Sequence, residues 1–252
     1  MTRRWLWVGL MTAPAVALGI GFGLTQPRAR ESADPLMSAI ERAARDLTRP
    51  VRVVAPISDE EENKVGAELA SKIPSRASDR VSRVGNRLLI HVRRTAIDYH
   101  FEAIEAPAET AFALPGGRIY VTTGLLNLTR DDDELAGVIG HEIAHVELGH
   151  CADSLRGERT LGKVLQEVLE PAYSETMERE ADQAGAALAK KGGYDPLALA
   201  RLFDRMAKDE PPRAPDDGHR SLAGLAKDAV VRYHDTHPRM ADRARAIRER
   251  GR

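Results

Sequence analysis

The spacing of apolar residues predicts a mostly helical chain. Over residues 32–48, apolar side chains recur every three or four positions, as on one face of an amphipathic helix that ends before Pro50. A second helix is predicted over residues 58–73, where Ser58 and Glu61 form a capping box. The same signals predict further helices over residues 78–91, 131–149, 153–170 and 174–192. Two more helices are predicted after these: Asp195 caps one that Pro196 opens, and a basic helix extends from about Pro238 to the end.

Two short segments between these helices have the pattern of strands. Residues 99–104 alternate in polarity, and residues 118–122 place Ile119 and Val121 on one face after a turn at residues 115–117. Together they predict a small antiparallel sheet. The expected fold class is therefore α+β, predominantly helical.

The N-terminal segment is predicted to export the chain or to anchor it in a membrane. Arg3 and Arg4 precede an uncharged run over residues 5–24. That run is longer than the roughly 7–15 residues of a signal-peptide core and close to the about 20 that span a bilayer. A retained anchor fits, and so does a cleaved signal, since Ala15 and Ala17 form a small-x-small pattern. A buried core helix is disfavoured because no polar residues mark one face.

Composition and charge exclude several classes of protein function and of metal site. Of 252 residues, 42% are hydrophobic, which suffices for one catalytic domain with short extensions. The formal net charge of -1 offers no field for nucleic acid, and 4% aromatic residues do not suit a base-stacking surface. Cys151 is the one cysteine of the sequence, so a disulfide framework and a multi-cysteine metal cluster are excluded. A metal would need histidine and carboxylate ligands.

The run His141-Glu142-Ile143-Ala144-His145 matches the H-E-x-x-H pattern and lies in a segment that is independently predicted to be helical. Residues four apart on a helix are rotated by only about 40° and raised by about 6 Å, so both imidazoles can bind one zinc ion. Glu142 lies beside them as the candidate general base.

A catalytic zinc needs a third protein ligand. The metzincin pattern would place Gly at 148 and His at 151, but the residues are Leu148 and Cys151. On a continuous helix His150 would lie on the wrong face, which favours a structural role or one behind the ligands. Glu178 and Asp182 share one face of a later helix, where one carboxylate could bind metal and the other could orient a ligating histidine. A merely solvated charged face is the alternative.

Several further motifs surround the H-E-x-x-H run: AFALPGG at 111–117, IYVT at 119–122, GLL at 124–126 and ELAGV at 134–138. Together with that run they resemble peptidase family M48. That family includes the HtpX and BepA proteases and the CAAX prenyl endopeptidases, and the layout here is closest to its short periplasmic members. The similarity extends over about residues 58–248.

The resemblance implies a zincin-type metallopeptidase domain with one zinc ion per subunit. It implies that Glu178, in an E-x-E-A-D sequence, is the third ligand and that Asp182 contacts a metal-binding histidine from behind. His237 and Arg243, in a His-Pro pair followed by Arg, correspond to residues near the reaction centre. Thr110 stands where relatives usually have Asn before the Ala-Phe-Ala run.

The expected chemistry is zinc-assisted attack of water on a peptide carbonyl, with Glu142 moving the proton. His237 and Arg243 are candidate catalytic residues that could stabilise the oxyanion, or His237 could cover the vacant metal position. The plain alternatives are a loop histidine and a solvated arginine. Residues 118–122 are expected to offer a strand edge to the substrate backbone.

These expectations divide the chain into a signal or anchor at residues 1–30, a helix and linker at 31–57 and a zinc metallopeptidase domain at 58–252. The expected function is hydrolysis of misfolded or misassembled envelope and membrane proteins. The enzyme would act in the periplasm, or facing it from a membrane anchor. A chaperone-like binding or assembly factor that retains the fold with little proteolysis is the alternative.

Overall fold

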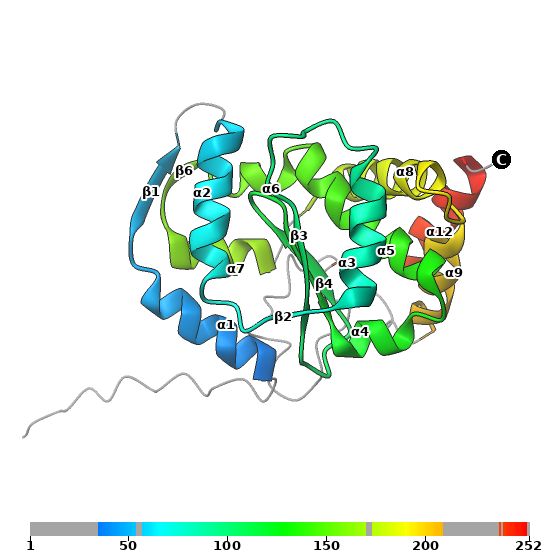
Figure 1. Ribbon diagram of the computed structural model, residues 1–252, viewed down its shortest axis with the longest axis horizontal. Coiled ribbons are helices and arrows are strands. Elements are labelled where there is room, and N and C mark those ends of the chain that lie inside the picture. The colour runs from blue at the N-terminus through cyan, green and yellow to red at the C-terminus, as the bar shows by residue number, and fades with distance from the viewer. Residues whose placement is uncertain (1–34, 54–56, 170–172, 209–236, 238, 251–252) are drawn as a thin grey trace, which may run out of the picture. The chain divides into compact units, whose positions relative to one another are not determined.

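The computed structural model describes residues 35–53, 57–169, 173–208, 237 and 239–250, and in this part of the chain helices predominate (Figure 1). The N-terminal segment lies outside the described residues. None of the described helices has the length and apolarity needed to cross a bilayer. The helices are α1 (Pro35–Asp46), α2 (Asp59–Ala70), α3 (Asp79–Leu89), α4 (Thr123–Leu128), α5 (Asp132–Glu147), α6 (His150–Asp153), α7 (Leu161–Leu169), α8 (Glu175–Lys191), α9 (Ala198–Met206) and α12 (Met240–Arg250). The strands are β1 (Pro50–Val53), β2 (Arg76–Ala77), β3 (His100–Ile104), β4 (Ala111–Leu114), β5 (Arg118–Thr122) and β6 (Gly157–Thr160).

The predicted helices begin where their capping residues indicated. Ser58 and Glu61 form the capping box of α2. The side chains of Asp131 and Ser174 accept backbone hydrogen bonds at the starts of α5 and α8. α9 begins at Ala198, two residues beyond Pro196, and Asp195 accepts a hydrogen bond from the backbone N–H of Leu197 just before the helix. The predominantly helical α+β class is confirmed.

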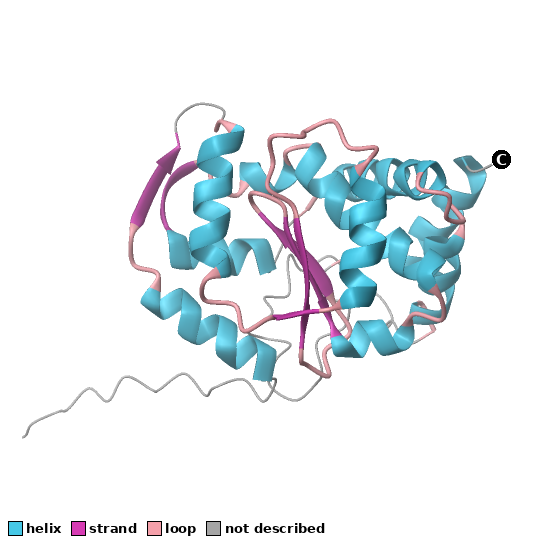
Figure 2. Ribbon diagram, viewed as in Figure 1, coloured by secondary structure: helices cyan, strands magenta, loops and turns pink. Residues whose placement is uncertain are grey.

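The central sheet is mixed rather than antiparallel. Its strand order is β2-β3-β5-β4, with β3 parallel to β5 and both outer pairs antiparallel. Figure 2 shows the strands of this sheet in magenta with helices on both sides of them. After β3 the chain forms β4 at the outer edge of the sheet. The turn at residues 115–117 then leads into β5, which lies between β3 and β4. Because β5 follows β4 in a hairpin, it runs in the direction of β3.

The prediction that residues 118–122 form an open strand edge is wrong. β5 is hydrogen-bonded to β3 on one side and to β4 on the other, so the edge beside it belongs to β4. The sequence pattern did not predict β4 because its four residues, AFAL, are all buried and show no alternation. A strand that is buried on both faces loses the period-two signal.

The predicted helix over residues 153–170 is interrupted. α6 ends at Asp153, Gly157 has a φ of 95°, and β6 pairs with β1 in an antiparallel ribbon before α7 begins at Leu161. Positive φ is readily adopted only by glycine and ends a helix. The partner that makes residues 157–160 a strand lies more than a hundred positions earlier, so no local pattern indicates it.

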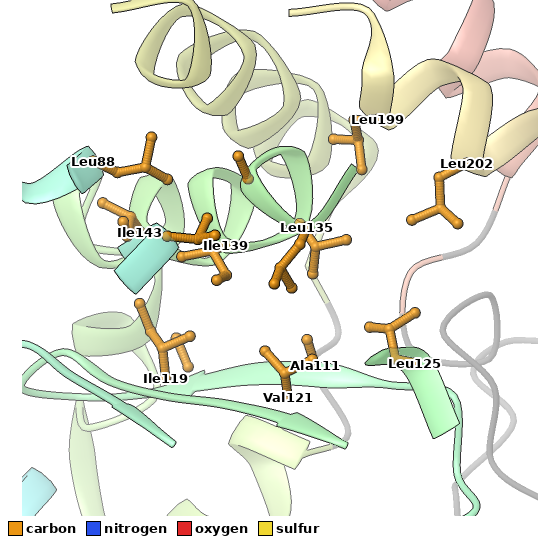
Figure 3. Packing of buried hydrophobic residues seen from close by; sticks show 14 of the residues in the cluster. Leu88, Ala111, Ile119, Val121, Leu125, Leu135, Ile139, Ile143, Leu199 and Leu202 are labelled. Atoms are coloured by element: carbon orange, nitrogen blue, oxygen red, sulfur yellow. The ribbon is translucent and has the colours of Figure 1, made fainter. Parts of the chain in front are cut away.

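The core surrounds α5. Every residue of that helix from Glu134 to Val146 is buried, which is typical of a helix covered on all sides. Figure 3 shows Leu135, Ile139 and Ile143 between sheet residues and residues of α3 and α9. A second cluster on the opposite face of the sheet joins α1, α2 and α7. The two histidines of α5 therefore project from a rigid, buried element.

Candidate metal centre

Side chains from outside the helix hold both ends of α5. At its start the Asp131 carboxylate accepts the Glu134 N–H at 2.8 Å, and Glu134 is paired with Arg205 at 2.6 Å. At its end the guanidinium of Arg94 donates to the backbone oxygen of Val146 at 2.6 Å. These contacts fix the helix that carries the H-E-x-x-H residues, since cap and charge interactions satisfy its terminal backbone groups.

The close crossing of α5 and α8 brings the carboxylates of α8 near the two histidines of α5. A Cβ on Gly185 would lie 2.7 Å from the backbone nitrogen of His141, and one on Gly140 would lie 2.9 Å from the backbone oxygen of Gly185. Only glycine permits this approach. Glu178 and Asp182 precede Gly185 by seven and three positions on the same helix face. From that spacing, Gly185 could have been predicted as the point where α8 packs closely against another helix.

Gly185→Ala is expected to lower both stability and metal affinity. In an uncrowded helix alanine would be favoured over glycine by about 1 kcal/mol, so any loss must come from the clash with His141. Overpacking of this kind costs roughly 1–3 kcal/mol, and relief by displacing α8 would withdraw Glu178 from the histidines. Denaturant unfolding and zinc competition with a chelator would measure the two effects. Ala187→Val, on the exposed face of α8, is the control, and a stabilised Gly185→Ala protein would contradict the prediction.

Four buried side chains of the described residues point their ligand atoms at one place. These atoms of His141, His145, Glu178 and His237 all lie within 4.8 Å of one another. The Nε2 atoms of His141 and His145 are 3.0 Å apart, and the Glu178 oxygens lie 3.7 Å from the first and 3.5 Å from the second. Ligands at zinc bond lengths in a tetrahedron are separated by roughly 3.3 Å. The three sequence-predicted ligands therefore have the spacing that a zinc ion requires.

The carboxylate of Glu178 also has the environment of a metal ligand. Glu178 is buried; the guanidinium of Arg243 lies 2.7 Å from its Oε2, and no described residue donates a hydrogen bond to its Oε1. Burial raises the pKa of Glu178, although the positive charge of Arg243 opposes this effect. Arg243 also pairs with Asp182, so one guanidinium serves two buried carboxylates, and buried negative charge that exceeds the positive charge around it is costly. A divalent cation between Glu178 and the two imidazoles would supply the balancing charge.

Asp182 orients His141 from behind. Its Oδ1 lies 3.0 Å from Nδ1 of His141, and Arg243 donates to both Asp182 oxygens at 2.7 and 2.8 Å. Burial opposes ionisation of Asp182, but the charge and hydrogen bonds of Arg243 outweigh it and hold the pKa of Asp182 well below its usual value. An ionised Asp182 accepts the Nδ1 proton of His141 and leaves Nε2 available to a metal.

His145 is held by an imidazole and an aromatic ring. Its Nδ1 lies 3.0 Å from Nδ1 of His150, and the Tyr173 ring stacks on it with centroids 4.1 Å apart. Burial lowers the pKa of His145 well below its usual value, and the neighbouring His141 adds to this effect. A neutral imidazole is the form that binds metal. No local pattern marks Tyr173, which precedes the cap of α8.

The structure also shows the surroundings of two polar residues near the C-terminus, His237 and Arg243. His237 is buried in the ligand cluster, with Nε2 3.8 Å from Oε1 of Glu142, so it is not an ordinary loop histidine. Arg243 is buried, and its guanidinium lies 2.7 Å from the Glu178 carboxylate and over the Phe203 ring at 4.5 Å. The alternative of a solvated arginine on a basic helix is therefore excluded.

Comparison with known proteins matches this arrangement to one family. The model described as Peptidase family M48 matches residues 75–169 and 159–251, which include all the residues of the cluster. The chain is 30% identical to mitochondrial metalloendopeptidase OMA1 of Arabidopsis thaliana over 60% of its length, but it spans only 31% of that protein. Metalloprotease LoiP of Escherichia coli is 27% identical over 70% of the chain and 71% of its own length. The beta-barrel assembly-enhancing protease of Escherichia coli is 23% identical over 50% of the chain and 32% of its own length.

Proposed function

The chain belongs to peptidase family M48, and on that premise we propose that it is a zinc-dependent metalloendopeptidase whose ion is held by His141, His145 and Glu178. The observation that carries the proposal is the convergence of two imidazole nitrogens and a buried carboxylate from two separate helices. Histidine and carboxylate ligands of this kind suit zinc, and three of them leave a fourth position for chemistry.

The residues around the ion would divide the reaction among them. When bound, zinc polarises the peptide carbonyl and lowers the pKa of water towards about 7. Glu142 is buried on the same helix as the two histidines and takes the proton of the attacking water, then delivers it to the leaving nitrogen. His237, across from Glu142, donates to the developing oxyanion or, as the alternative, covers the fourth position in the resting protein.

Arg243 acts by holding the carboxylates rather than by contacting substrate. Its guanidinium donates to both oxygens of Asp182 and to the backbone oxygen of His237, and it pairs with Glu178. A planar donor used in this way fixes several groups at once.

The proposal also includes the location of the enzyme and the class of its substrates. The uncharged run at residues 5–24 supports export, with the chain acting in the periplasm or anchored to a membrane that faces it. The similarity to a protease named for β-barrel assembly supports misfolded or misassembled envelope and membrane proteins as substrates.

Metal analysis of Glu178→Ala tests the ligand set. The full chain is expected to bind one zinc ion, and the variant is expected to lose more affinity than the roughly 10–100-fold that removal of an outer contact costs. Glu175→Ala, at an exposed position of the same helix, is the matched control. Equal zinc content in the Glu178→Ala and wild-type proteins would refute the assignment. Capture of unfolded casein by zinc-loaded wild type without cleavage would indicate a binding factor instead.

A further inference from the structure

We propose that His150 is a positioning residue for the metal centre: its imidazole accepts the Nδ1 proton of His145 and thereby keeps Nε2 of His145 directed at the ion. This inference rests on the proposed function because it takes His145 as a ligand. The contact that carries it joins the Nδ1 atoms of the two rings at 3.0 Å, and both rings are buried.

The proton positions follow from this contact. Nε2 of His145 is the atom that faces His141 and Glu178, at 3.0 and 3.5 Å. If Nε2 offers its lone pair to a metal, the neutral ring carries its proton on Nδ1. That proton can be shared only with an acceptor, so Nδ1 of His150 must be unprotonated. His150 then carries its own proton on Nε2, which lies 3.7 Å from a carboxylate oxygen of Glu180.

A backbone reversal brings His150 to this place. α5 ends at Glu147, and Gly149 has a φ of 79° before α6 begins at His150. In a continuous helix residue 150 would be rotated by about 140° from His145 and could not reach its ring. The helix end therefore converts a residue on the wrong face into a direct neighbour of His145.

The charge of the centre explains why an imidazole suits this position. Asp182 already orients His141, and Glu178 and Glu142 are also buried within the site. These three carboxylates would balance the guanidinium of Arg243 and one divalent ion. A fourth buried carboxylate behind His145 would leave uncompensated negative charge, which is costly in a buried site. A neutral histidine supplies the acceptor without that charge.

Two substitutions of His150 test the proposal in the full chain. His150→Leu removes the acceptor and is expected to weaken zinc binding about 10- to 100-fold in chelator competition, the usual cost of losing an outer contact to a ligand. The visible absorption of the cobalt-substituted protein is expected to change with it. His150→Asn can place an amide oxygen where Nδ1 stood and is expected to restore affinity to within a few fold. His100→Leu, at a half-exposed histidine that pairs with Asp98, should match wild type.

The outcomes separate this inference from the proposed function. If wild type binds neither zinc nor cobalt, the proposed metallopeptidase function fails. If wild type binds zinc and His150→Leu matches it in affinity and cobalt spectrum, or His150→Asn binds as weakly as His150→Leu, only the role of His150 is overturned. Should His150→Leu not fold, nitrogen-15 NMR of the zinc-loaded wild type decides: a proton on Nε2 of His150 supports the proposal, and a proton on Nδ1 overturns it.

Discussion

Glu142→Gln is expected to lower kcat/KM for cleavage of an unfolded protein such as casein by about 10²–10⁴-fold while zinc remains bound. Glutamine preserves the size of the side chain but cannot take a proton from water. Metal content should be unchanged because the proposed ligands are His141, His145 and Glu178, which the substitution leaves in place. Proteolysis assays and metal analysis on the same preparation would measure both quantities.

The control for this change is Glu60→Gln, an exposed glutamate of α2 that pairs with Lys64. It removes the same charge at a position far along the chain from the centre and should leave proteolysis unaltered. Undiminished casein cleavage by zinc-loaded Glu142→Gln would exclude the proposed general base.

Arg243→Met is expected to lower the free energy of unfolding of the metal-free protein by about 3–5 kcal/mol. The guanidinium pairs with Asp182 and Glu178 at 2.7 Å, and all three groups are buried. Removing it leaves two carboxylates in a buried site without their cation, which costs more than the pair itself contributes. Denaturant unfolding in the presence of a chelator would measure the loss.

The same substitution distinguishes the two roles considered for Arg243. A residue that only donates to the oxyanion would lower kcat and leave the stability of the metal-free chain unchanged. Arg245→Met is the matched control, since Arg245 is exposed on the same helix and its ion pair with Asp242 is of the surface kind that contributes at most about 1 kcal/mol. Equal unfolding free energies for Arg243→Met and wild type would contradict a positioning role.

The local chemistry of this protein could be predicted from short stretches of sequence. Two histidines four positions apart on a helix must share a face, and so must Glu178 and Asp182, because the helical repeat imposes it. Capping residues are equally local: Ser58, Asp131 and Ser174 mark the helix starts that the structure has. Each of these inferences depends on residues within one or two helical turns.

Pairings between distant segments could not be predicted in this way. β1 pairs with β6 across more than a hundred residues, and β5 lies inside the sheet because β4, which has no alternating pattern, occupies its outer side. The contact of His150 with His145 requires the left-handed backbone of Gly149. Each depends on which surfaces meet after folding, and apolar burial is not directional enough to encode that choice in a local pattern.

The candidate metal centre depends both on local sequence patterns and on contacts between distant segments. The residue types and their spacing along α5 and α8 could be predicted from the sequence, because helix geometry determines which residues a few positions apart share a face. The separation of the two helices, set by Gly140 against Gly185, and the burial of Arg243 between two carboxylates exist only in the folded molecule. A metal site needs its ligand atoms within a few ångströms of one point, and only tertiary packing determines a distance between helices to that precision.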